Sequence, residues 1–435
     1  MLHIAGISAH QSSGAGDACF RVFARRLLLE VGSMSRRNIL SSSLLACLPL
    51  LVVLGDVAAQ SRSGNEQAAT LAPTGKILFR TSAVDPDGTV RGSRLLRINA
   101  DGSALHPLMP MVEGIFNGSP TWSPGGGLVA FERFNTLLDR TDIFLMDSQG
   151  QQLHRLTDGS TKFHKPAWGP GGTIAFVSDD GPVHWGYVGS CLGTIRADGS
   201  QQQHLFCPGV VPAQRALSPI EVSRPTWTAD GTSILIEAGY YGGLTAEEWY
   251  SAMYKVDART GAATLLTWKI GEEGGTFAPN GSDAVYVQWG CPVQPPCSAG
   301  VLSIYRFDIA SQQSTQLADG YAPLYSPDGS RIAFTRTFLD TTDPDVPRYD
   351  QVFVMNADGT NIRQLTSTKV DNIEYLAADW SRDSTQLLVN RTLYSEENGR
   401  RVNPRPALRI IDIDSGAITS VSAGYAYRGA WFQPR

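Results

Sequence analysis

One repeated stretch constrains the fold of this chain more than any other, and residues 323–366 give its clearest copy. The copy begins with an aromatic residue, Tyr325, and a tight turn containing Pro327, Asp328 and Gly329. Three short runs of alternating apolar residues follow, separated by a loop and a second turn. Pro and Gly set the backbone angles of such turns, and an alternation of period two gives each strand one buried face. The pattern predicts a four-stranded antiparallel meander.

The pattern recurs along the chain. The aromatic residue that precedes the first turn is found at Trp122, Trp168, Trp227, Phe277, Tyr325, Trp380 and Trp431, at spacings of 46, 59, 50, 48, 55 and 51 residues. The second turn recurs independently, in segments that start at residues 97, 144, 194, 254, 305, 354 and 410. One four-stranded propeller blade takes about 40 to 50 residues. Seven aromatic residues and seven turns therefore predict an all-β, seven-bladed propeller over residues 75–435.

The order of these signals also predicts how the ring closes. The first of the second turns precedes the first aromatic residue, and no strand follows the last aromatic residue, Trp431. We expect the strand around residues 427–432 to complete the blade that begins at residues 76–80. Such closure hides sheet edges that would otherwise promote aggregation.

These repeats resemble a known family. Their order, W-S-P-D-G, then I-A-F, V-M-N-A-D-G and Q-L-T, is similar to the WD40-like PD40 repeats of TolB-like exported propellers. Residues 325–366 carry the pattern best and residues 120–157 follow it well, whereas the blades at Trp227, Phe277 and Trp380 keep only parts of it. The resemblance implies a propeller fold and an exported binding protein. It does not identify a ligand, because one fold serves many functions.

The amino-terminal part has the features of an export signal. From Met34 the chain has a basic start, an apolar run over residues 39–54 and the small residues Val57, Ala58 and Ala59. We predict cleavage after about Ala59, with residues 1–33 as an upstream extension, 34–59 as the signal and 60–74 as a linker. Arg36 and Arg37 also fit a twin-arginine signal, and the choice between the two export routes stays open. The apolar run is shorter than a membrane span, and Cys47 matches a lipoprotein signal only faintly.

The charge balance argues against a nucleic-acid partner. Without residues 1–59 the chain has 31 basic and 38 acidic side chains, and no basic stripe stands out. Duplex binding rests mainly on clustered Lys and Arg. We expect a periplasmic or secreted monomer without a membrane span in the mature chain. Its expected partner is a protein, a peptide or a glycan of the cell envelope.

The long loops predict where a ligand would bind. They lie between the second and third strands of the blades, at residues 134–142, 178–190, 238–251, 288–300, 337–350 and 393–406. Aromatic rings in them offer flat apolar contact with a polar edge, which suits sugars or extended peptides. An alternative is that each ring only packs beneath its own loop. The candidate binding residues are Trp185, Tyr187, Tyr240, Tyr241, Trp249, Tyr250, Trp289, Tyr349 and Tyr394.

Metal ligands are weaker candidates. Asp340, Asp343, Asp345 and Asp350 offer hard oxygen ligands to calcium, but their spacing matches no EF-hand, and a solvated acidic loop is the favoured interpretation. The histidines, with His164 and His184 among them, are expected on different blades and have no metal-binding motif. Oligogalacturonate lyases are propellers that use a metal, which keeps a metal-assisted carbohydrate enzyme as the alternative function.

Four cysteines are placed to form two disulfides. Cys191 and Cys207 lie symmetrically on either side of the turn at Gly199, so antiparallel pairing places them opposite each other. Cys291 and Cys297 lie in one long loop. Disulfides fit an oxidising compartment, and free buried thiols are the alternative.

No motif of a nucleophilic or nucleotide-dependent enzyme is present in the sequence: there is no G-x-S-x-G and no Walker loop. We therefore predict no cofactor. Our first functional hypothesis is a non-catalytic binding module.

Overall fold

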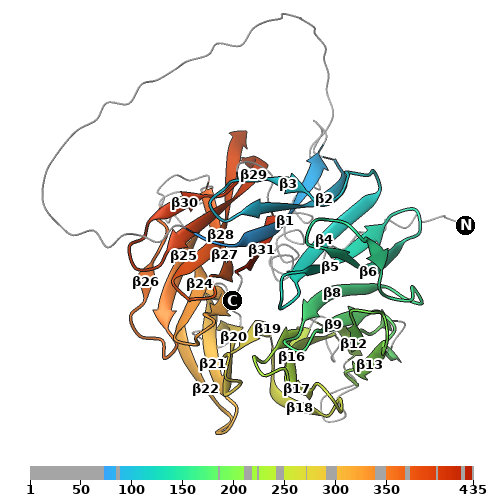
Figure 1. Cartoon of the computed structure of the whole chain (residues 1–435). Helices are drawn as coiled ribbons and strands as arrows, with labels where there is room; N and C mark the ends of the chain where they lie inside the picture. Colours follow the sequence, from blue (N-terminus) through green and yellow to red (C-terminus); the bar gives the residue numbers. More distant parts are fainter. Residues whose placement is uncertain are drawn as a thin grey trace, which may run out of the picture. The chain divides into compact units, whose positions relative to one another are not determined.

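The structure, a computed structural model, contains only strands as regular elements in the part of the chain that it describes (Figure 1). This part comprises residues 73–84, 89–184, 187–209, 218–222, 225–241, 249–270, 272–290, 301–338, 349–367, 373–397, 400–422 and 427–433. Residues 73–433 of this set belong to one compact unit. The predicted extension, signal and most of the linker lie outside the described residues.

Seven of the eight antiparallel sheets in the described part of this unit are blades. From the innermost strand outward, blade 1 consists of β31 (Tyr427–Phe432), β1 (Lys76–Val84), β2 (Val90–Asn99) and β3 (His106–Pro107). Blade 2 consists of β4 (Ile115–Trp122), β5 (Leu128–Asn135), β6 (Arg140–Asp147) and β7 (His154–Arg155). Blade 3 consists of β8 (Phe163–Trp168), β9 (Thr173–Ser178), β12 (Cys191–Arg196) and β13 (Gln203–Phe206).

The other four blades repeat this order. Blade 4 consists of β14 (Ser218–Val222) and β15 (Thr226–Trp227), which both pair with β16 (Ser233–Tyr241), and then β17 (Trp249–Asp257) and β18 (Ala263–Ile270). Blade 5 consists of β19 (Glu272–Phe277), β20 (Asp283–Gly290), β21 (Val301–Asp308) and β22 (Gln313–Asp319). Blade 6 consists of β23 (Tyr321–Tyr325), β24 (Arg331–Phe338), β25 (Tyr349–Asn356) and β26 (Arg363–Gln364). Blade 7 consists of β27 (Ile373–Trp380), β28 (Gln386–Glu397), β29 (Arg400–Asp412) and β30 (Ile418–Ser420).

The predicted closure of the ring is confirmed. Strand β31 pairs antiparallel with β1, so that Ile77 lies opposite Trp431 and Leu78 opposite Ala430. In Figure 1 the last strand, in red, accordingly belongs to the same sheet as the first, in blue. The seven-bladed all-β fold predicted from the repeats is therefore correct.

Seven hydrophobic clusters hold the ring together, and each is shared by two neighbouring blades. The cluster between blades 7 and 1, for example, packs Ile77 and Phe79 against Leu388 and Ile410. The remaining six clusters connect blades 1 and 2, 2 and 3, 3 and 4, 4 and 5, 5 and 6, and 6 and 7. The alternating apolar residues of each strand thus fill the two interfaces on either side of its blade.

Three of the repeated tryptophans also bond between blades. The indole Nε1 of Trp122 donates to the carbonyl of Ala430, that of Trp227 to Ala167 and that of Trp380 to Leu324, at 3.0 to 3.2 Å. Each acceptor immediately precedes the aromatic residue of the preceding blade. An indole is suited to this position because it fills the apolar interface and keeps its one donor satisfied.

The two ends of the blades differ in their connections. At one end, which we call the turn face, short turns join the first strand to the second and the third to the fourth, as at residues 123–127 and 148–153. Many of these turns have an Asp that accepts from a Ser or Thr two residues later. The hydroxyl and amide of Ser103, for instance, hold the pKa of Asp101 below its ordinary value. The opposite end, the loop face, carries the connections between second and third strands.

A further hairpin lies on the loop face of blade 3. Strands β10 (Val183–His184) and β11 (Tyr187–Val188) pair within the connection from β9 to β12. The sequence predicts only a loop here.

Candidate functional site

Most of the predicted aromatic binding residues are at the loop face, but their side chains are not described. Five of them lie at the loop-face ends of strands β11, β16, β17 and β20, where the backbone alone is described: Tyr187, Tyr241, Trp249, Tyr250 and Trp289. Trp185 lies outside the described residues. Their role in binding stays a prediction.

Tyr240 belongs to the core and not to the exposed surface. It is fully buried on β16, and its hydroxyl lies 2.9 Å from the hydroxyl of Tyr254. Burial, together with this neighbour, raises the pKa of Tyr240 above its ordinary value. Tyr240 is buried because it lies within the paired part of β16, opposite Tyr250. A loop-face ligand does not reach this ring.

Tyr349 and Tyr394 are half-buried and are held by neighbours. The ring of Tyr349 stacks on Phe338, with centroids 5.3 Å apart. The hydroxyl of Tyr394 donates to Glu374 Oε2 at 2.9 Å. These two residues fit the alternative reading of the aromatic rings, in which each packs beneath its own loop.

Two leucines project from the loop face of blade 2. Leu137 and Leu138 are 94% and 60% exposed in the connection between β5 and β6. Asn135 Oδ1 accepts from both of their amides, at 3.0 and 3.3 Å, and Asp139 ends the turn at a φ of +46°. The Thr136 amide also bonds the Gly114 carbonyl at 3.0 Å. The turn is thus ordered while its apolar side chains face water.

The sequence reasoning missed these leucines. It included them in the loop at residues 134–142 but singled out only aromatic rings. The available signal was the pair of adjacent leucines in an otherwise polar turn. Because large apolar side chains next to each other in water are unfavourable, such a pair often marks a contact with another molecule.

Blade 3 carries a polar cluster at its loop-face end. His164 Nε2 lies 2.8 Å from Asp179 Oδ1, and the hydroxyl of Ser190 donates to the same carboxylate at 3.2 Å. Burial opposes the charge of Asp179, but the contacts with His164 and Ser190 and the charge of Lys165 together outweigh it and hold the pKa of Asp179 below its ordinary value. The other ring nitrogen of His164, Nδ1, is buried without a partner.

Lys165 connects three blades beside this cluster. Its buried ammonium group donates to Glu221 Oε1 at 2.8 Å and to the Val222 carbonyl at 2.9 Å, both in blade 4. Its backbone amide donates to Glu132 Oε2 of blade 2 at 3.0 Å. A φ of +55° in an irregular part of β8 gives Lys165 this orientation. The contacts of Lys165 are polar and charged, and its ammonium group and backbone amide both have hydrogen-bond partners.

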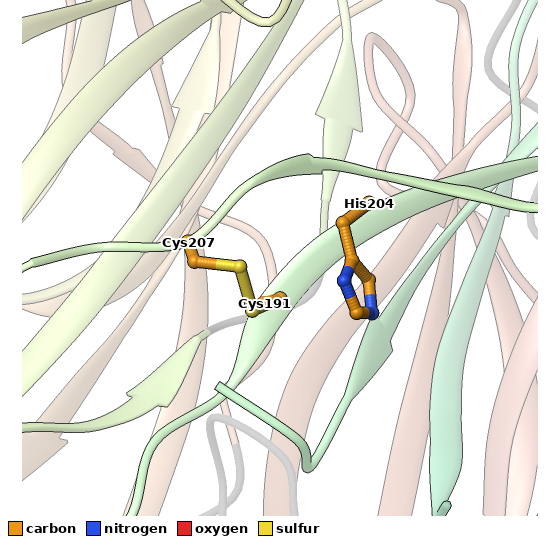
Figure 2. A group of neighbouring side chains, drawn as sticks. All are labelled: Cys191, His204 and Cys207. Atoms are coloured by element: carbon orange, nitrogen blue, oxygen red, sulfur yellow. A yellow bond between two sulfur atoms is a disulfide. The ribbon is translucent and has the colours of Figure 1, made fainter. Parts of the chain in front are cut away.

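The Cys191 and Cys207 side chains form a disulfide in blade 3, as Figure 2 shows. Their Cα atoms lie 4.2 Å apart across β12 and the residue that follows β13. His204 lies beside them, and its Nε2 is 3.1 Å from Asp180 Oδ1. Cys291 and Cys297 lie outside the described residues, and their pairing stays a prediction.

The predicted metal ligands do not come together in the described part of the chain. Asp340, Asp343 and Asp345 lie outside it, and only the backbone of His184 is described. Asp350 accepts a hydrogen bond from the Thr337 hydroxyl at 2.7 Å. The Nε2 atom of His164 contacts Asp179, and its Nδ1 atom is buried. Among the described residues, one group of three has metal-ligand spacing: Cys191, His204 and Cys207.

Comparison with known proteins identifies the fold. No family model and no curated protein matches the chain. Among solved structures, the β-propeller domain of the Trilobed protease from Pyrococcus furiosus aligns with 81% of this chain and 93% of its own, at 11% identity and a TM-score of 0.52. The chain is a β-propeller. An oligogalacturonate lyase from Vibrio parahaemolyticus aligns with 80% of this chain and 86% of its own, at 12% identity and a TM-score of 0.51. TolB from Acinetobacter baumannii covers 81% of this chain and 82% of its own, at 16% identity and a TM-score of 0.43.

These likenesses concern architecture. A protease domain and a lyase both have this propeller fold at 11 to 12% identity, so the fold alone does not select a function. The Pyrococcus domain is described as having an open velcro topology, whereas here β31 pairs with β1. In the described part of the propeller, no helix has the length and apolar character required to cross a bilayer.

Proposed function

We propose that this propeller is an exported binding module that captures a protein or peptide partner on its loop face. The observation that carries the proposal is the turn at residues 135–139, where Leu137 and Leu138 are exposed on an ordered backbone. An ordered turn loses little conformational entropy on binding. Apolar side chains that are already in place then gain the full benefit of leaving water.

The ring supports this proposal mechanically. Seven interblade clusters fix the strand ends, so the loop-face residues keep their relative positions. The exposed ion pair of Asp139, in the turn itself, with Lys162 offers a polar edge to the apolar contact. An apolar centre with a polar edge is the usual composition of a binding interface.

The test uses matched substitutions on the two faces. Leu137→Ser together with Leu138→Ser is expected to weaken binding of the partner recovered from cell envelopes by about 10-fold or more, since burial of a leucine is worth about 1.5 to 3 kcal/mol. Leu105→Ser with Leu153→Ser is the control, because these leucines are 57% and 40% exposed on the turn face. Both proteins should keep the wild-type melting temperature.

Equal loss of binding in both variants would contradict a loop-face site. Undiminished binding by the Leu137/Leu138 variant would remove the turn from the interface. The predicted rings Trp249 and Trp289 are tested in the same assay by replacement with Ala, which is expected to weaken capture without lowering the melting temperature.

A metal-assisted carbohydrate enzyme is a second candidate, and His164 favours it. A histidine that is oriented by a carboxylate through one nitrogen commonly offers the other nitrogen to a metal. This hypothesis predicts a divalent ion that survives purification, and activity on a polysaccharide that a chelator removes. A purified chain that cleaves no polysaccharide array when divalent ions are supplied would refute it.

Export and a monomeric state complete the proposal. The signal-like segment that ends at about Ala59 supports the former, and the disulfide of blade 3 fits an oxidising compartment. Mass spectrometry of the mature protein is expected to give an amino terminus near Gln60. Light scattering is expected to give the mass of one chain.

A further inference from the structure

A bulge places three metal-binding side chains on one side of blade 3. In the pairing of β12 with β13, Leu192 lies opposite Phe206, but Gly193 lies opposite His204, so that Leu205 is an extra residue. Side chains alternate along a strand, and residues three apart would ordinarily lie on opposite faces. The extra residue brings His204 to the same face as Cys207, beside Cys191.

The donor atoms of these residues are close to one another. One ring nitrogen of His204 and the two sulfur atoms lie within 4.8 Å of each other. Figure 2 shows the imidazole next to the disulfide, with one ring nitrogen on the side of the sulfurs. The Nε2 atom contacts Asp180 Oδ1 at 3.1 Å and the Ser178 hydroxyl at 3.3 Å. A carboxylate that accepts from Nε2–H leaves Nδ1 as the nitrogen with a free lone pair.

We propose that reduction of the Cys191–Cys207 disulfide converts this corner of blade 3 into a zinc site. Its ligands are the two thiolates and His204, and Asp180 orients the imidazole. Two thiolates and one imidazole are a typical donor set for tetrahedral Zn²⁺, and their softness disfavours Mg²⁺ and Ca²⁺. Because His204 is exposed, water reaches the fourth position.

The reductant is a dithiol. Its thiolate attacks the sulfur of Cys207, which is half-buried and thus more accessible than the buried Cys191. The S–S bond breaks, Cys191 leaves as a thiolate, and the second thiol of the reductant resolves the mixed disulfide. Two electrons and two protons pass to the propeller, and the dithiol becomes a disulfide. Zinc binding then releases the two thiol protons, because the ligands are thiolates.

In the oxidised protein the same sulfur atoms share a covalent bond and offer no thiolate. The site therefore responds to redox conditions: the propeller carries a disulfide when oxidised and holds zinc when reduced. Gly193 lies opposite His204 in the pairing of β12 with β13. A Cβ at this position would meet the Phe176 ring at 2.4 Å.

The test is a titration with Co²⁺, a spectroscopic substitute for Zn²⁺. It uses the full chain with Cys19, Cys47, Cys291 and Cys297 replaced by Ser, so that Cys191 and Cys207 are the remaining thiols. After reduction by a dithiol and its removal without air, one equivalent of Co²⁺ is expected to give the absorption of thiolate-to-cobalt charge transfer. Addition of Zn²⁺ should abolish this absorption. The oxidised protein should show none.

Three variants identify the ligands. Cys191→Ser is expected to lose the one-equivalent site, and His204→Ala to weaken it strongly. Asp180→Asn keeps all ligands and is expected to raise the Kd about 10-fold through loss of orientation. The matched control is Asp198→Asn, an exposed turn residue of the same blade, which should leave the Kd unchanged.

Three results would contradict the proposal. One is a reduced protein that keeps its near-ultraviolet circular dichroism but gives no charge-transfer absorption. Another is loss of that dichroism on reduction, since the site requires the folded blade. An unchanged Kd in His204→Ala would likewise remove the histidine from the site and contradict the proposed ligand set.

Discussion

Asp379 lies in blade 7 and contacts the strand that closes the ring. Its carboxylate accepts from the amide of Trp380 at 2.9 Å and from that of Trp431, in the next blade, at 2.8 Å. Loss of water around the carboxyl group outweighs these two hydrogen bonds and raises the pKa of Asp379 to about 6. The other blades have Thr121, Ala167, Thr226, Thr276, Leu324 and Ala430 at this position.

The raised pKa predicts a pH dependence of stability. The folded chain binds this proton more tightly than the unfolded chain, whose Asp has a pKa of about 3.9, so the contribution of Asp379 to stability increases as pH falls from about 7 to 4. A shift of about two pKa units corresponds to about 3 kcal/mol. This is an upper limit, because Asp379 is only half-buried. Urea unfolding at pH 7 and pH 5 should show it as a difference between wild type and Asp379→Asn. A difference that is the same at both pH values would contradict this pKa.

Lys165 gives a second prediction about a single residue. Lys165→Met removes the donors to Glu221 and Val222 across the blade interface, and we expect a loss of about 1 to 3 kcal/mol in the free energy of unfolding. Lys162→Met is the control, because the Lys162–Asp139 pair lies at the surface and exposed pairs contribute about 0 to 1 kcal/mol. Equal losses in the two variants would show that the buried contacts of Lys165 stabilise the fold no more than the exposed Lys162–Asp139 pair.

Contacts such as that of Lys165 with Glu221 could not be predicted from the sequence. Lys165 and Glu221 are 56 positions apart, and their contact depends on the juxtaposition of two blades and on a positive φ at Lys165. The position of Cys191 opposite Cys207 was predictable because both flank one short turn. The position of His204 beside them was not, because it depends on one extra residue in β13.

At the level of elements, short turns were predictable and loop conformation was not. A turn of two to five residues is specified by its own Asp, Gly and Pro, as at Asp328 and Gly329, whose φ is +73°. The hairpin of β10 with β11 and the separate pairing of β14 and β15 with β16 were not predicted, because the local sequence pattern does not specify which residues of these connections pair. The burial of Tyr240 on β16 depends on packing that the local sequence likewise does not show.

The turn between β5 and β6 allows an element-scale prediction. Asn135→Ala removes the acceptor of the Leu137 and Leu138 amides but leaves both leucines unchanged. The turn should therefore lose order. Hydrogen exchange of these two amides should become about 10-fold faster, in line with a net loss of about 1 kcal/mol per hydrogen bond. Partner binding should weaken with it. Unchanged exchange would mean that other contacts order the turn.

The whole molecule depends on the pairing of its two ends. Without residues 427–435, β1 becomes an open edge, and Trp431 leaves the cluster shared by blades 7 and 1. Because loss of a buried Trp alone costs about 3 to 5 kcal/mol, we expect this truncation to lower the melting temperature and to promote association through β1. Size-exclusion chromatography and thermal unfolding measure both effects. A truncated chain that remains monomeric with the wild-type melting temperature would show that closure does not stabilise the ring.

The central claim is that the loop face, and not the turn face, meets the partner. Site-specific photo-crosslinking in intact cells tests it most directly, with the photoreactive residue placed at Leu137 or at Leu105. We predict a discrete crosslinked product from position 137 and none from position 105. A product from position 105 alone, or the same product from both positions, would contradict the claim.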